Sequence, residues 1–200
     1  MEIFRRSWGV ISDPSRFFSK IKKEKGLKKA FTYFFVLSLF GTVMSFAANE
    51  MLLDYVYGPL MNAYGFSAPQ QEVSQQIVGT WYAIMFFSGL LISFLMAGLI
   101  HLWIMLFGGK EEYEKTYQIY AYSKTPSFLF GWIPFFSVLA EAYHVVLLIA
   151  GTHKIQGIER NRAIWMFAVP YLIYIAVSII FLMQFMNSDA MSVFLTNSTI

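Results

Sequence analysis

The chain has 200 residues and no cysteine; 57% of its residues are hydrophobic and only 14% are charged. An average soluble domain has about 45–50% apolar and about 25% charged residues, so this composition argues against a soluble globular protein. The absence of cysteine excludes disulfides, iron–sulfur clusters, thiolate zinc sites and catalytic thiols. The charge is uneven as well, because 12 of the charged residues lie among the first 29, ahead of a long apolar body.

Residues 1–29 are predicted to form a basic interfacial segment. Asp13 followed by Pro14 is a favourable helix start, because aspartate caps the first turn and proline fits into it. Aromatic and basic side chains follow at helical spacing and can lie on an anionic membrane surface. Alternatively, the basic residues serve only to orient the chain during insertion. The predicted membrane-surface residues are Arg16, Phe17, Phe18, Lys20, Lys22 and Lys23.

Four apolar stretches are long enough to cross a bilayer, which takes about 20 mostly apolar residues in a helix. They cover residues 30–49, 77–109, 125–153 and 163–188. The third stretch is interrupted near its middle by Gly131, Pro134 and Ser137, and proline disfavours helix there. We therefore expect this stretch to turn back, as two short, tilted or partly re-entrant segments. The predicted spans are 30–49, 79–107, 117–136, 138–153 and 163–186, followed by an outer tail at 189–200.

The positive charges predict the orientation, because lysine and arginine are retained on the cytoplasmic side during insertion. All 15 basic residues lie before residue 30, between residues 110 and 124, or between residues 154 and 162. Five crossings from a cytoplasmic amino terminus place all of them inside, whereas four crossings, the main alternative, leave the last group outside. The sequence thus predicts an all-α polytopic transmembrane bundle with five spans and an outer carboxyl terminus.

Small residues recur at spacings of three or four along the first two spans. Such faces let helix backbones approach closely in a membrane, where lipid gives no hydrophobic drive for association. One further step of four along the second span leads to His101, which is then expected to face protein. The predicted helix-packing residues are Gly41, Ser45, Gly89, Ser93 and Ala97.

The stretch between residues 110 and 124 has oppositely charged pairs four apart. Tyr113, Tyr117 and Tyr120 form a stripe on a neighbouring helix face. Together these patterns predict an amphipathic helix on the cytoplasmic membrane surface, with its aromatic side chains toward the headgroups.

Glu141 and His144 are the candidate polar residues within the spans, together with His101. An ionisable side chain inside a span costs roughly 2.5–3.5 kcal/mol at the helix centre and is a functional candidate by default. If the chain turns near Pro134, however, Glu141 lies near the outer interface, where it can be hydrated or paired with His144. We favour this structural role. No metal site or other cofactor is expected, because the topology scatters the histidines and Glu141.

Several segments in chain order carry a resemblance to a known family. They are Asp13–Phe18, Lys25–Ala30, Gly108-Gly109, Tyr120–Pro126, Leu147–Ile158 and Arg162-Ala163. In this order the chain resembles the Yip1 family of small polytopic membrane proteins, most closely its shorter prokaryotic-type members.

This resemblance implies five spans, a cytoplasmic amino terminus and no catalytic centre. Eukaryotic members act in vesicle traffic, associate with prenylated Rab-type GTPases and with one another, and influence the shape of endoplasmic reticulum and Golgi membranes. The long cytosolic amino-terminal region of those members is absent here, which argues against GTPase binding. The short head and the lack of cysteine favour a prokaryotic protein of the cell membrane; a eukaryotic one would lie in the endoplasmic reticulum or Golgi.

The expected function is that of a non-enzymatic membrane organiser, or a trafficking-like adaptor or scaffold, acting through helix packing and cytoplasmic loops. Its expected partners are the lipid bilayer and other membrane proteins, including further copies of the chain; no nucleic acid is expected. The alternative is a small transporter or channel, in which Pro126 and Pro134 break helices beside Glu141 and His144 to form a polar site.

Overall fold

The computed structural model describes residues 2–52 and 75–186, and this part of the chain is helical throughout, without strands. The predicted outer tail at 189–200 and most of the loop between the first two spans lie outside the described residues. In chain order the helices are α1 (Glu2–Ser12), α2 (Pro14–Ile21), α3 (Lys28–Leu52), α5 (Gln75–Leu106), α6 (Tyr113–Ser123), α7 (Thr125–Phe130), α8 (Phe136–Gly151), the π-helical turn η2 (Thr152–Gln156) and α9 (Arg160–Met186).

Helix α2 begins where the sequence predicts. The Asp13 carboxylate accepts a hydrogen bond from the Arg16 backbone N–H at 3.0 Å, and Pro14 occupies the first turn. The predicted membrane contact is wrong for Phe18, whereas Phe17 is only half-buried. Phe18 is fully buried, and the ring of Phe17 packs edge-on against Phe18 at 5.5 Å, because α2 lies against α8 and η2.

Four helical segments in the described part are long and apolar enough to cross a membrane, at 28–49, 76–106, 136–156 and 160–181. They match the first, second, fourth and fifth predicted spans. At the third, predicted for 117–136, the chain forms two shorter helices, α6 and α7, which meet at Lys124. The chain then turns between Phe130 and Phe136, around Pro134 as predicted, and α8 runs back beside α7.

Helix α6 is the centre of the bundle. Every residue from Thr116 to Ser123 is buried, and α6 packs against α3, α5 and α8. The prediction of a surface helix is therefore wrong for this segment, since Tyr117 and Tyr120 lie in the core. The spacing of residues along α6 could not reveal its burial, because the polar side chains of α6 form hydrogen bonds with a part of the chain that is distant in sequence.

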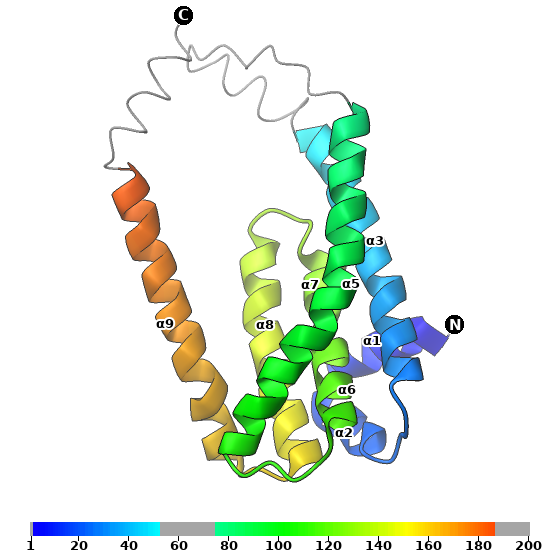
Figure 1. Ribbon diagram of the computed structural model, residues 1–200, viewed down its shortest axis with the longest axis vertical. Coiled ribbons are helices and arrows are strands. Elements are labelled where there is room, and N and C mark those ends of the chain that lie inside the picture. Colours follow the sequence, from blue (N-terminus) through cyan, green and yellow to red (C-terminus); the bar gives the residue numbers. More distant parts are fainter. Residues whose placement is uncertain (1, 53–74, 187–200) are drawn as a thin grey trace, which may run out of the picture.

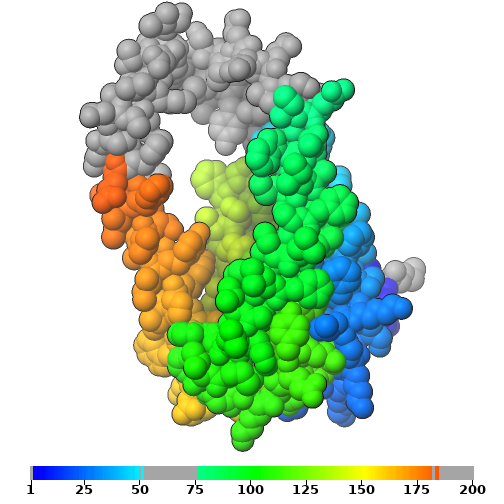
Figure 2. Space-filling model, viewed as in Figure 1, coloured from blue at the N-terminus to red at the C-terminus, as the bar shows by residue number. Residues whose placement is uncertain are grey.

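Within the described residues, more helices gather at one end of the bundle than at the other. In Figure 1, α1, α2 and η2 gather near the end at which α3 begins, and the tip of the α7–α8 hairpin lies well short of the far ends of α3 and α5. Helix α9 packs on α8 and η2 and leans away from the hairpin toward its carboxyl end, as Figure 2 also shows. Among the described residues, the end formed by α1, α2, α6 and η2 is therefore the one at which more helices gather.

Candidate functional site

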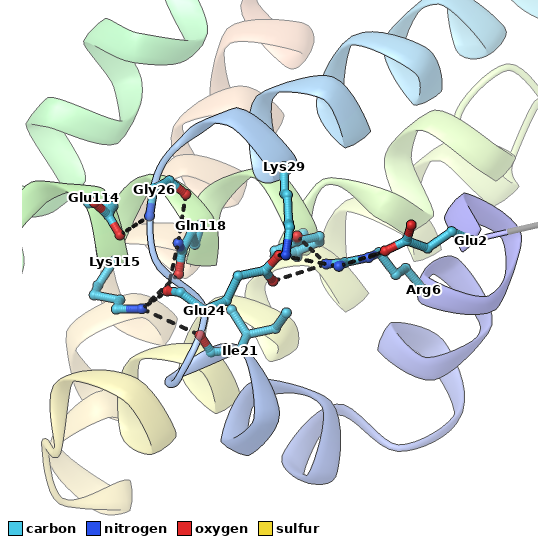
Figure 3. Close-up of polar contacts among 10 residues, drawn as sticks. Glu2, Arg6, Ile21, Glu24, Gly26, Lys29, Glu114, Lys115 and Gln118 are labelled. Carbon is cyan, nitrogen blue, oxygen red and sulfur yellow. Dashed lines mark hydrogen bonds and ion pairs between the residues drawn. The ribbon is translucent and has the colours of Figure 1, made fainter.

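Arg6 joins the first helix to the rest of the protein. Its Nη1 atom donates hydrogen bonds to Glu24 Oε2 at 3.0 Å and to the Tyr122 hydroxyl at 2.7 Å. Its Nε and Nη2 atoms donate to Glu2 Oε1 at 3.1 and 2.9 Å (Figure 3). One guanidinium thus connects α1, the turn before α3, and the buried helix α6.

The Arg6 and Glu24 side chains are only 19% and 10% exposed, so the pair is largely removed from water. Burial by itself would raise the pKa of Glu24, but the hydrogen bond and charge of Arg6, and then those of Lys29 at 3.4 Å, outweigh it and hold this pKa below its ordinary value. Burial would likewise lower the pKa of Arg6, but Glu24, Tyr122 and Glu2 raise it instead. Both side chains are therefore ionised at neutral pH.

Three side chains of α6 hold the backbone turn between α2 and α3. Lys115 Nζ donates to the carbonyl oxygens of Ile21, at 3.4 Å, and Glu24. Gln118 Nε2 donates to the carbonyls of Glu24 and Gly26 at 3.3 and 3.1 Å. The Gly26 N–H donates to Glu114 Oε1 at 2.5 Å (Figure 3). We call Arg6, Glu24, Glu114, Lys115, Gln118 and Tyr122 the docking cluster.

A buried tyrosine extends this connection toward the membrane helices. The Tyr33 hydroxyl of α3 lies 3.0 Å from Ser7 Oγ of α1 and 2.8 Å from Thr125 Oγ1 of α7. Its ring lies 4.9 Å from that of Tyr122. Sequence analysis missed both tyrosines, because their partners are distant in the chain.

Glu141 pairs with Lys124 rather than with His144. Lys124 Nζ lies 3.2 Å from Glu141 Oε2 and donates to both carboxylate oxygens. The sequence analysis placed Lys124 at the end of a cytoplasmic loop, and the structure corrects this, because α6 and α7 carry it into the hairpin. One signal could have found the pair: Lys124 and Glu141 have opposite charges and lie on either side of the predicted turn near Pro134, and residues that flank such a turn can face each other in a helical hairpin.

The three histidines lie apart from one another. His101 Nδ1 is 2.9 Å from Thr116 Oγ1, so its ring meets protein as expected. His144 is buried and its ring lies edge-on to Tyr120 at 6.3 Å, while His153 Nδ1 is 2.8 Å from the carbonyl oxygen of Ile158. Within residues 2–52 and 75–186, no three histidine, aspartate or glutamate side chains come together as metal ligands do.

The predicted packing residues fall into two groups. Gly41, Ser45, Ser93 and Ala97 lie at helix contacts: a Cβ on Gly41 would be 3.0 Å from the Phe128 carbonyl oxygen, and Ser93 Oγ lies 3.3 Å from the Tyr117 hydroxyl. Ala97 is fully buried, and the Ser45 carbonyl accepts a hydrogen bond from Tyr82 at 3.3 Å. Gly89 differs, because a Cβ there would meet no atom of the described chain within 4 Å.

The predicted surface cations lie where solvent reaches them. Arg16, Lys20, Lys22 and Lys23 are all exposed, and Lys22 Nζ lies 3.5 Å from Glu111 Oε1. The other three have no acidic partner within the described part of the chain.

The Yip1 domain model matches residues 8–182. The chain belongs to the Yip1 family. No curated protein and no solved structure matches it. The Yip1 match and the apolar helices together show that the chain is an integral membrane protein. The Yip1 family is generally involved in membrane trafficking. The matched region contains the end of α1, all of α2 and the docking cluster except Arg6, which lies just before it.

Proposed function

We propose that this Yip1 protein is a non-enzymatic membrane organiser that threads the bilayer five times, with its amino terminus in the cytoplasm and its carboxyl terminus outside. The five passes are α3, α5, α6–α7, α8 and α9. The distribution of lysine and arginine supports this orientation, since all except Lys124 lie before α3, at its start, or near the turns on the same side of the bundle.

The gathering of α1, α2 and η2 at one end of the described bundle is the observation that carries the proposal. In this orientation the end with α1, α2, η2 and the docking cluster lies in or beside the cytoplasmic leaflet (Figure 1). A body that is wider in one leaflet expands that leaflet and favours membrane curved toward it. The docking cluster supports this action, because it fixes α1 and α2 to the bundle instead of leaving them as loose anchors.

We call this expansion of the cytoplasmic leaflet by the amino-terminal helices the wedge, and exposed aromatic side chains of α1 add a second contribution to it. Phe4 and Trp8 lie one turn apart and are 79% and 67% exposed. Large aromatic side chains on the free face of an amphipathic helix insert at the headgroup level, and such insertion is sensitive to curvature. The proposed partners are therefore the lipid bilayer first, and further copies of the chain or other membrane proteins second. The proposed location is the cell membrane of a prokaryote.

Curvature sorting tests this function. The full-length labelled protein is reconstituted into giant vesicles, thin tubes are pulled from them, and protein density on tube and vesicle is compared. We expect enrichment on the tube that grows as the tube narrows, and we expect Phe4→Ala/Trp8→Ala to reduce it. Trp165→Ala is the matched control, because Trp165 is also 67% exposed but lies on the spanning helix α9. Equal density at all tube radii would refute the wedge.

One observation supports a second candidate function, that of a transporter. Glu141 lines a groove of about 380 Å³ between α8 and α9, together with Tyr171, Tyr174 and Ser178. A charged pair beside such a groove is a candidate polar site in a membrane. The test is flux in proteoliposomes: the transporter predicts that Glu141→Gln abolishes the movement of an ion or solute, whereas the organiser predicts no difference across a broad panel.

A further inference from the structure

A cleft of about 730 Å³ lies between α1 and α2, on the outside of the docking cluster. Six of its lining side chains are cationic, and they come from both helices, from the turn that follows α2 and from the start of α3. A cavity of this size accommodates a small organic group. The question is whether the charges around it are already neutralised by the protein.

The acidic residues of the cleft are already engaged. Glu2 and Glu24 both pair with Arg6, and Glu24 also with Lys29 at 3.4 Å. Asp13 caps α2 through the Arg16 backbone N–H. These contacts neutralise Arg6 and Lys29 but leave the other cations of the lining without an anion.

Four cations of the lining remain unpaired. They are Arg5 of α1, Arg16 and Lys20 of α2, and Lys23 just after α2; all four are exposed, and none has an acidic partner in the part of the chain that the structure describes. Like charges around one cleft raise its electrostatic potential and attract an anion. Two arginines from opposite walls favour phosphate in particular, because the guanidinium fork matches two phosphate oxygens.

Trp8 indicates where the anion comes from. It lines the same cleft, and Phe4 lies one turn away on α1, with both side chains largely exposed. Aromatic side chains of this kind lie at the headgroup level of a membrane. The cleft therefore opens where lipid phosphates are concentrated, not toward bulk solvent.

We propose that the cleft between α1 and α2 binds the phosphate of an anionic phospholipid headgroup. The proposal names a ligand class and rests on the cytoplasmic placement of α1 and α2 proposed above; it does not require that the protein bends membranes. Arg5 and Arg16 hold the phosphate oxygens from the two walls, and Lys20 and Lys23 supply the remaining positive charge.

Native mass spectrometry of the full chain in mild detergent tests this site, with phosphatidylglycerol and phosphatidylcholine as probes. We expect phosphatidylglycerol to be retained in preference to phosphatidylcholine. Arg16→Gln/Lys20→Gln should weaken its retention by roughly tenfold or more, since each basic residue contributes several-fold to the attraction. Arg5→Gln/Lys23→Gln changes two other residues of the lining and should weaken phosphatidylglycerol retention as well. If the first variant unfolds at a lower temperature than wild type, the retention measured for this second variant tests the site instead.

The control carries the same loss of charge elsewhere on the same end of the protein. Lys25 and Lys110 are exposed and do not line the cleft, so Lys25→Gln/Lys110→Gln should retain phosphatidylglycerol within about twofold of wild type. Equal losses in the control and cleft variants, or no loss in the cleft variants, would overturn the proposal. Complete displacement of the lipid by millimolar inorganic phosphate would show that the cleft binds a free anion. Binding of polyglutamate that depends on the cleft residues, without a preference among lipids, would show that it binds an acidic protein. Either result would overturn the proposal of a lipid headgroup.

The two proposals fail separately. Headgroup binding is measured in detergent, where no curvature exists, and curvature sorting is measured on tubes of uncharged lipid, where no anionic headgroup is present. A wedge without a headgroup site would still sort onto narrow tubes, and a headgroup site without a wedge would still retain phosphatidylglycerol.

Discussion

Arg6 Nη1 lies 3.0 Å from Glu24 Oε2, and this contact fastens the first helix of the chain to the turn that leads into the first spanning helix. The same guanidinium reaches the Tyr122 hydroxyl at 2.7 Å, in the most buried helix of the bundle. The amino-terminal helices are therefore packed as part of the domain, and the wedge and the headgroup cleft both depend on this attachment.

Removing the Glu24 charge should loosen the attachment. Glu24→Gln leaves Arg6 charged and largely buried with only the exposed Glu2 as its anion, so we expect the free energy of unfolding to fall by about 2 kcal/mol. Thermal unfolding in detergent measures this loss, and limited trypsin digestion should become faster within residues 2–29. Glu111→Gln is the control, because the Glu111 side chain is more exposed, at 34%, and has one ion pair, with Lys22 Nζ at 3.5 Å; an equal loss there would contradict a special role for Glu24.

The same residue predicts a dependence on pH. Glu24 has a lower pKa in the folded chain than its ordinary value of 4.5, so its stabilisation is fully present above pH 4.5 and is lost as the pH falls through the folded pKa. The difference in unfolding temperature between wild type and Glu24→Gln should thus be constant from pH 7 to about 5 and close at lower pH. A difference that stays the same down to pH 3 would show that the charge of Glu24 does not contribute.

The sequence predicted those features that depend on neighbouring residues. The Asp13-Pro14 helix start is local, and so are the apolar lengths of α3, α5 and α9 and the turn around Pro134, and all of these are found. The burial of α6 is not local. Glu114 and Lys115 have the spacing of surface ion pairs within a helix, but they form hydrogen bonds with the turn before α3, about 90 residues away in the chain. Because these polar side chains are satisfied there, α6 can be buried in the core.

The candidate site divides in the same way. The position of Glu141 in an apolar stretch predicted that its carboxylate needs a partner. The identity of that partner, Lys124, depends on which helix faces Glu141 in the hairpin. The docking cluster gave no sequence signal, because Arg6 and Tyr122 are ordinary residues until the fold brings them together. The basic residues of α2 were predicted, but the cleft between α2 and α1 was not.

A matched pair of glycines tests the packing of α3 on α7. A side chain at Gly41 would meet the Phe128 carbonyl oxygen, whereas one at Gly89 has open space around it within the described chain. Gly41→Leu should therefore destabilise the protein by roughly 1–3 kcal/mol through overpacking, and Gly89→Leu should have little effect. Thermal unfolding of both variants in detergent checks the difference, and an equal loss in both would refute the close contact.

The ion pair within the hairpin can be examined by a double-mutant cycle. Lys124→Met leaves Glu141 without its cation, and we expect a loss of roughly 1–3 kcal/mol. Glu141→Gln in the same chain should recover much of that loss, because no unpaired charge remains. The measurement is the unfolding temperature of the two single variants and the double variant in detergent. Purely additive effects would mean that the two side chains do not interact.

The threading of the chain can be tested with introduced cysteines, because the natural sequence has none. Five passes predict that Glu159→Cys is labelled from the cytoplasm and Ser198→Cys from outside by an impermeant maleimide. The tip of the hairpin decides between a crossing and a re-entrant loop. Residues 113–130 span roughly 27 Å as helix, close to the hydrocarbon thickness of about 30 Å, so Phe135→Cys should be labelled from outside but more slowly than Ser198→Cys. Labelling of Phe135→Cys from the cytoplasm would make the hairpin re-entrant, and labelling of Glu159→Cys and Ser198→Cys from the same side would refute the odd number of crossings.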